Sequence, residues 1–148
     1  GMGMALAGKI DKKIYRVFTL LGDGECQEGS VWEAAQFAAH HKLDNLVAII
    51  DYNKLQAMGK ISDILGLEPL LDKWNSFNWA VCEVDGHNIE ELTDVLKEAP
   101  LEKGKPTCVI AHTIKGKGIS FMEGIPIWHY RLPNEKEMEI AKVELGIT

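Results

Sequence analysis

The chain has 148 residues and a formal net charge of −6 at pH 7. This length suffices for one domain with an ordinary hydrophobic core, and the negative charge argues against a nucleic-acid or anionic-membrane surface. Three cysteines, none in a Cys-x-x-Cys pair, fit a reducing compartment. The sequence contains no run of about 18 apolar residues and nothing that resembles a signal peptide. We therefore expect a cytoplasmic protein without a membrane anchor.

The first half of the chain alternates between predicted strands and helices. Residues 1–10 read as the second half of a helix, and the continuous apolar run over 14–21 predicts a buried strand. Ser30 and Glu33 have the spacing of a capping box, which predicts a helix to about Leu43. A second strand is expected over 46–51. The stretch 54–67 is predicted to be a long loop, which is unusual enough to suggest function.

The second half continues this alternation. A short helix near 69–74 is expected before a third strand over 78–84, and Asn88 opens a helix with an apolar stripe. A fourth strand is predicted over 107–113, an irregular segment over 114–133, and an amphipathic helix from Asn134 onward. This pattern predicts a single α/β domain over 1–148, with a parallel sheet and helices on both faces.

Two of the predicted strands stop at oxygen-bearing side chains. The first runs into Gly22-Asp23-Gly24, and the second runs into Asn53. If these strands are parallel neighbours, Asp23 and Asn53 lie together at the carboxyl edge, where open α/β sheets bind ligands. Carboxylate and amide oxygens are ligands that Mg²⁺ or Ca²⁺ takes, and Mg²⁺ often adds phosphate oxygens. The sequence therefore predicts a metal-bridged phosphate site, to which Leu55 could add its backbone carbonyl.

Each candidate residue also has an ordinary structural interpretation. Gly-Asp-Gly is a common turn, and an Asn after a strand is usually a turn residue. Glu28 is a favourable carboxylate at a helix start. Lys115, in a glycine-rich loop, is usually just solvated, and His129 is compatible with a surface position beside an aromatic residue. The helix after Gly24 favours the functional interpretation, because its free N–H groups and positive dipole end point to the same edge.

Longer stretches around these residues resemble transketolase. They are Gly22-Asp-Gly-Glu-Cys-Gln-Glu-Gly-Ser-Val-Trp-Glu-Ala34 and Leu43-Asp-Asn-Leu-Val-Ala-Ile-Ile-Asp-Tyr-Asn-Lys-Leu-Gln56. Gly-Asp-Gly, a gap of 28 residues and then Asn53 is similar to the thiamine diphosphate motif. Lys115-Gly-Lys-Gly118 and Trp128-His129 are also similar to transketolase. The resemblance covers nearly the whole chain and matches the N-terminal half of the enzyme, as found in two-subunit forms.

The resemblance implies a thiamine diphosphate site with Mg²⁺. Asp23 and Asn53 would be side-chain ligands of the metal, for which Ca²⁺ is a possible substitute, and Leu55 would be a carbonyl ligand. Gly22 would belong to the turn at the cofactor, and Gly24 would offer its N–H to the diphosphate.

Three further residues receive roles from the resemblance. Glu28 matches a glutamate buried between the two cofactor sites of the dimer, where a shared proton couples them. His129 matches a histidine near the diphosphate and the substrate, and Lys115 would reach a phosphate. We therefore expect Glu28 and His129 to be the catalytic residues of this chain. His112, at the end of a predicted strand, is a weaker candidate.

The implied reaction is the transfer of a two-carbon ketol unit between sugar phosphates, with the cofactor as electron sink. The glutamate that activates the aminopyrimidine belongs to a pyrimidine-binding domain that these 148 residues lack. We therefore expect a partner, the transketolase C-terminal subunit, in a homo- or hetero-oligomer. The chain departs from the family at Tyr130, where a glycine is usual, and in lacking the region expected before Met4, so the domain is expected to be incomplete at its N-terminal side.

Two other functions are compatible with these residues. The chain could be a truncated, non-catalytic cofactor-binding fragment, an interpretation that the absent upstream region favours. It could also be an E1-type component of another thiamine diphosphate enzyme, which the flank Glu25-Cys-Gln-Glu-Gly29 disfavours.

Overall fold

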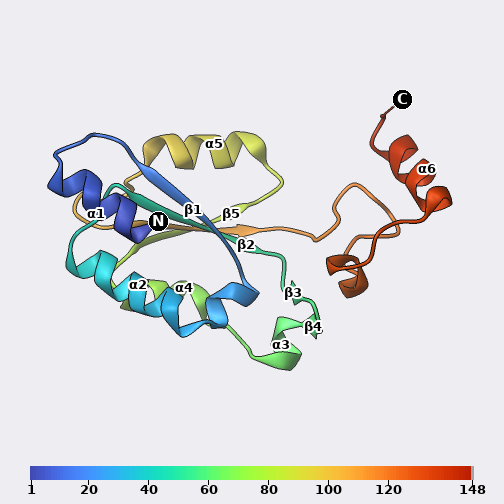
Figure 1. The fold of residues 1–148 in the computed structure, drawn as a ribbon, viewed down its shortest axis with the longest axis horizontal. Coiled ribbons are helices and arrows are strands. Elements are labelled where there is room, and N and C mark those ends of the chain that lie inside the picture. Colours follow the sequence, from blue (N-terminus) through green and yellow to red (C-terminus); the bar gives the residue numbers. More distant parts are fainter. Residues whose placement is uncertain (148) are drawn as a thin grey trace.

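A four-stranded parallel sheet forms the centre of the computed structural model, which describes residues 1–147 (Figure 1). The strand order is β1-β2-β6-β5, with bounds Val17–Gly22, Leu46–Tyr52, Thr107–His112 and Ala80–Asp85. Gly22 pairs with Asp51, and Tyr52 pairs with His112. Because the strands are parallel, their carboxyl ends reach one edge of the sheet. The predicted α/β class and the parallel sheet are confirmed.

Three helices cover one face of the sheet: α1 (Met2–Ile10), α2 (Gly29–His40) and α4 (Leu70–Ser76). Tryptophans fill the space beneath them. Trp74 is 1% exposed, and its ring lies 4.8 Å from that of Trp79 and 5.3 Å from that of Trp32, between centroids. The indole N–H of Trp79 donates to the carbonyl of Ala35 at 2.9 Å, which ties this aromatic cluster to α2.

A single helix, α5 (Ile89–Glu98), packs on the other face. It begins at Asn88, whose side chain accepts the N–H of Glu91 and so caps the helix as predicted. Helices on both faces are therefore confirmed, but α5 does not cover β1. Leu20 is 71% exposed, and Ile14 lies outside the strand and is fully exposed. The prediction of a buried strand over 14–21 is wrong in this respect, because β1 is an edge strand with one open face.

The capping box predicted at Ser30 and Glu33 is wrong. The short 3₁₀ helix η1 (Gly24–Gln27) leads directly into α2, which begins at Gly29 with Glu28 in the N-cap position. Ser30 therefore lies within the first turn, where its side chain is not at the cap. The capping box that the structure does contain is at Asn134 and Glu137, at the start of α6 (Glu135–Glu144).

The loop predicted over 54–67 contains regular structure. A two-stranded antiparallel hairpin joins β3 (Leu55–Gln56) to β4 (Gly59–Lys60), and the helical turn α3 (Ile61–Ile64) follows. Lys54 enters the hairpin with φ of +66°, and Gly59 has φ of +145°. These positive φ values turn the chain back on itself within a few residues, so that the hairpin lies beside the ends of β1 and β2.

Residues 114–147 form an arm that extends away from the sheet (Figure 1). Its first part is irregular, as predicted, with a 3₁₀ helix, η2 (Pro126–His129), and its last part is the predicted helix α6. Hydrogen bonds within the arm join Ser120 to Glu144 and the indole of Trp128 to the carbonyl of Phe121. Within residues 1–147, no helix has the length and apolar character needed to cross a membrane.

Candidate cofactor site

Asp23 directly follows β1 and is 1% exposed. Its carboxylate accepts the N–H of Gly24 at 2.8 Å and the N–H of Lys54 at 2.5 Å. Its own N–H donates to the carbonyl of Asp51 at 3.3 Å. The end of β1 is therefore hydrogen-bonded to the chain on both sides of Asn53, which places Asp23 beside the end of β2.

Asn53 directly follows β2, and its carboxamide is held at both ends. The Oδ1 atom accepts the N–H of Leu55 at 2.9 Å, and the Nδ2 atom donates to Asp51 Oδ2 at 3.3 Å. The structure thus brings together Asp23, Asn53 and the main chain of Leu55, the three residues that the sequence suggested as metal ligands. This follows from the parallel pairing of β1 with β2.

The electrostatics at this edge favour a cation. Burial raises the pKa of the Asp23 carboxyl, and the nearby charge of Asp51 raises it further, while the N–H groups of Lys54 and Gly24 act in the opposite direction. None of the ion pairs among residues 1–147 includes Asp23 or Asp51. Because buried carboxylates without a positive partner are costly, a divalent cation would offset this cost.

Few protein side chains are available to such a cation. Among residues 1–147, no three Asp, Glu, His or Cys side chains converge to hold a metal. A site built from one buried carboxylate, one amide oxygen and one carbonyl fits Mg²⁺, which typically takes one or two protein carboxylates and completes its shell with phosphate oxygens and water.

Three residues at this edge were not predicted from the sequence. Asp51 and Thr113 are joined by a hydrogen bond from the threonine hydroxyl to Asp51 Oδ1. Gln56 lies against Gly24: a Cβ added to Gly24 would stand 3.4 Å from the Cβ of Gln56. The Nε2 atom of Gln56 is buried without a hydrogen-bond partner in the described part of the chain. The period of two along β2 could have revealed Asp51, because it shares a strand face with Asn53.

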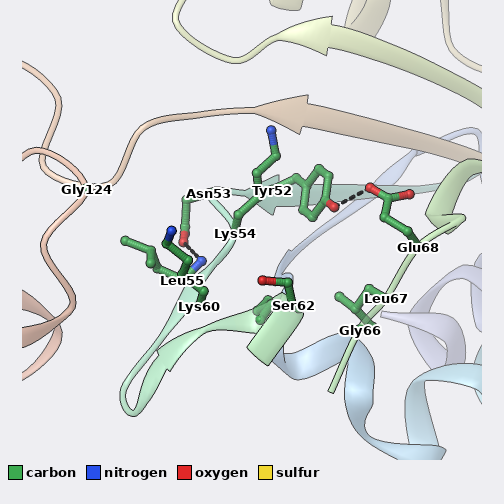
Figure 2. A pocket seen from close by; sticks show the side chains of 11 residues that line it. Tyr52, Asn53, Lys54, Leu55, Lys60, Ser62, Gly66, Leu67, Glu68 and Gly124 are labelled. Carbon is green, nitrogen blue, oxygen red and sulfur yellow. Dashed lines mark hydrogen bonds between the residues drawn. The ribbon is translucent and has the colours of Figure 1, made fainter. Parts of the chain in front are cut away.

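A pocket of about 550 Å³ lies beside Asn53 and Leu55 (Figure 2). Its walls come from the end of β2, the hairpin, the segment leading to α4, and Gly124 of the arm. Tyr52 donates its hydroxyl to Glu68, which also accepts the N–H of Leu70 at 2.9 Å. The hydrogen bond from Tyr52 lowers the pKa of the Glu68 carboxyl, so Glu68 is an anion at neutral pH.

Of the predicted site residues, Asn53 and Leu55 line this pocket, whereas Asp23, Gly24 and the others do not. Gly22 ends β1, and its N–H donates to Glu25 at 3.2 Å. Glu28 is exposed and lines a different pocket of about 340 Å³ between α1, β1 and α2. The carbonyl of Lys115 accepts the N–H of Gly124 at 2.9 Å, so its loop borders the pocket.

The two candidate histidines are also separate from one another. His129 is exposed at the end of η2 and does not line the pocket. His112 is the last residue of β6, and its Nε2 lies 3.1 Å from Glu83 of β5. The structure therefore assembles the predicted residues at the ends of β1 and β2, and it distributes Glu28, Lys115 and His129 around them.

A parallel sheet in which a buried aspartate and an asparagine follow neighbouring strands belongs to the open α/β class, whose members bind ligands at the carboxyl edge of the sheet. Within that class, residues 6–148 match the family described as transketolase, thiamine diphosphate binding domain. The chain belongs to this family.

Similarity to individual proteins agrees with this membership. The chain is 44% identical over 146 residues to an apulose-4-phosphate transketolase subunit from Phocaeicola vulgatus, covering 99% of this chain and 52% of that relative. It is 44% identical over 144 residues to a 6-deoxy-6-sulfo-D-fructose transketolase subunit from a Clostridium species, covering 97% of this chain and 52% of that relative.

The fold is also that of a solved transketolase. The structure from Campylobacter jejuni is 29% identical and superimposes with a TM-score of 0.92, covering 99% of this chain and 24% of that one. The chain thus spans about half the length of the two curated relatives and about a quarter of the solved enzyme.

Proposed function

We propose that this chain is the diphosphate- and Mg²⁺-binding part of a transketolase that transfers a two-carbon ketol unit between sugar phosphates. The observation that carries the proposal is the buried carboxylate of Asp23, which lies beside Asn53 without a basic partner among the described residues. Family membership supports thiamine diphosphate as the cofactor. The free cysteines support a cytoplasmic location.

In this proposal, Asp23, Asn53 and the carbonyl of Leu55 would hold Mg²⁺, which would supply positive charge for the diphosphate. The turn at Gly22 and Gly24 allows the diphosphate to approach the backbone closely, because neither residue carries a side chain. When bound, thiamine diphosphate supplies the electron sink for ketol transfer. This chain orients the cofactor and neutralises its charge. Lys115 and His129 approach the diphosphate and substrate from the arm, and Glu28 meets the second site of an oligomer.

A second chain is part of the proposal. The two relatives are named as transketolase subunits, which supports a partner that carries the pyrimidine-binding domain. Their names also specify substrates that carry a phosphate or a sulfonate group, which supports anionic sugars as the substrate class for this chain. The exposed position of Glu28 is consistent with a surface that a partner covers.

Titration calorimetry with thiamine diphosphate and with pyrophosphate, each with and without Mg²⁺, tests the cofactor site. We expect Mg²⁺-dependent binding that differs little between the two ligands, because these residues do not include the domain that would bury the pyrimidine. Loss of a residue that hydrogen-bonds to a metal ligand typically lowers metal affinity roughly 10- to 100-fold. Asp23→Asn should lower the affinity by more than this, because Asp23 is proposed to be a ligand itself. Asp94→Asn, at an exposed position on α5, should bind as the unaltered chain does. Tight, metal-independent binding would contradict this site.

Activity distinguishes a catalytic subunit from a non-catalytic fragment. The chain alone should show no transketolase activity with a ketose phosphate, even with excess cofactor and Mg²⁺. Activity that appears only with a pyrimidine-domain subunit, together with the upstream region that the family resemblance implies, would support the proposal. Robust activity from the chain alone would refute the requirement for a partner.

A further inference from the structure

Asp51 hydrogen-bonds to the residues that follow three different strands. Its carbonyl accepts the N–H of Asp23, after β1, at 3.3 Å. Its Oδ2 accepts the side-chain amide of Asn53, after β2, at 3.3 Å, and its Oδ1 accepts the hydroxyl of Thr113, after β6. The side chain of Asp51 thus connects Asn53 with β6 at the edge where the cation is proposed to bind.

This contact determines which end of the Asn53 carboxamide is available. An ionised carboxylate only accepts hydrogen bonds, so Asp51 can face the NH₂ end of Asn53 and not its oxygen. The N–H of Leu55, at 2.9 Å from Asn53 Oδ1, supports the same orientation from the other side. Without Asp51, one of the two contacts that hold the carboxamide would be lost, and its NH₂ group could rotate toward the cation.

We propose that Asp51 is a positioning residue of the cation site, which directs the amide oxygen of Asn53 to the metal and is itself oriented by Thr113. This inference rests on the proposed function, because it requires Asn53 to be a metal ligand. The two carboxylate oxygens of Asp51 contact Asn53 and Thr113, and the substitutions below separate this indirect role from direct coordination.

Two substitutions separate orientation from charge. Asp51→Ala removes both side-chain hydrogen bonds. Asp51→Asn keeps the shape: its oxygen can accept from Asn53, and its NH₂ can donate to the Thr113 hydroxyl, which rotates to accept. A positioning role therefore predicts that asparagine retains what alanine loses. Direct coordination predicts that both variants lose affinity, because both lack the carboxylate.

Mn²⁺ with inorganic pyrophosphate is the probe, measured by electron paramagnetic resonance for affinity and by water proton relaxation for metal-bound water. We expect Asp51→Ala to bind Mn²⁺ about 10- to 100-fold more weakly and with more bound water, as for loss of other groups that orient metal ligands. Asp51→Asn should bind close to the unaltered chain on both measures. Asp94→Ala, at an exposed position on α5, is the matched control, and urea unfolding without metal verifies that each variant is folded.

Two results would overturn the inference: a folded Asp51→Ala with unchanged affinity and hydration, or an Asp51→Asn as weak as Asp51→Ala. If Asp51→Ala does not fold, Thr113→Val removes one hydrogen bond from the same connection and should weaken Mn²⁺ binding in the same direction; unchanged binding would again overturn it. If the unaltered chain does not bind Mn²⁺ with pyrophosphate, the proposed function itself fails, and the role of Asp51 fails with it.

Discussion

The two faces of the sheet differ in how completely they are covered. On one face, α1, α2 and α4 enclose an aromatic core in which Trp74 is 1% exposed. On the other, α5 packs over β2, β5 and β6 and leaves Leu20 of β1 71% exposed. Both faces belong to the same four apolar strands. The difference shows that an apolar run can predict a strand without showing whether a neighbouring element covers it.

Among substitutions that compare the two faces, Trp74→Ala should lower the free energy of unfolding the most. It removes a buried indole from a well-enclosed site, so the free energy of unfolding should fall by about 3–5 kcal/mol. Trp74→Phe should cost less, because it retains a ring beside Trp32 and Trp79 and removes an indole N–H that has no partner within residues 1–147. Urea unfolding followed by circular dichroism measures both. A loss of under about 1 kcal/mol for alanine would show that this face is less well packed than described.

Glu68→Gln should lower the free energy of unfolding by less, and its effect should depend on pH. Glu68 lies at the edge of the enclosed face, where it accepts a hydrogen bond from Tyr52. The hydrogen bond from Tyr52 lowers the folded-state pKa of Glu68 below its unfolded value near 4.5. The ionised group therefore stabilises the fold above the unfolded pKa, and this contribution is lost as the pH falls through the folded pKa.

Because Glu68 is exposed, we expect glutamine to cost below about 1 kcal/mol at pH 7, with the difference fading at a pH below the folded-state pKa. The urea midpoints of both proteins at the two pH values give this result. An equal difference at both would show that the charge of Glu68 is not responsible.

Leu20→Thr should have the smallest effect, within about 0.5 kcal/mol, because Leu20 is largely in solvent and threonine is favourable in strands. Val17→Thr, in the same strand but 7% exposed, is the matched control and should destabilise more. Thermal unfolding of the two variants compares an open and a covered position on one strand. Equal losses would mean that the open face is covered in solution.

The fold could be predicted where local patterns and tertiary packing agree. The second, third and fourth strands were placed within two residues of their observed bounds, and Asn88 opens a helix as predicted, since its side chain accepts the N–H of Glu91. Ser30 failed as a cap because η1 moved the helix start to Gly29. The hairpin after Lys54 was missed because its strands are only two residues long and depend on positive φ values that lysine seldom adopts.

The candidate site shows the same limit. The meeting of the ends of β1 and β2 follows from the predicted parallel sheet, so Asp23 and Asn53 could be placed together from sequence. Thr113 could not, since its contact with Asp51 requires β6 to lie directly beside β2, and local sequence patterns do not determine the order of strands in a sheet. The positions of Glu28 and His129 depend on how α2 and the arm leave the sheet, which the motifs do not determine.

The arm over 114–147 makes few contacts through which unfolding of the sheet would be coupled to its own. Its hydrogen bonds include the internal pairs Arg131–Glu137 at 2.7 Å and Ser120–Glu144 at 2.8 Å, and α6 lies far from the sheet (Figure 1). Regions with few buried contacts to the core can open without global unfolding. We therefore expect the arm to unfold as a separate unit, at a lower free energy than the sheet. Since Gly124 lines the pocket, each such opening also removes one wall of it.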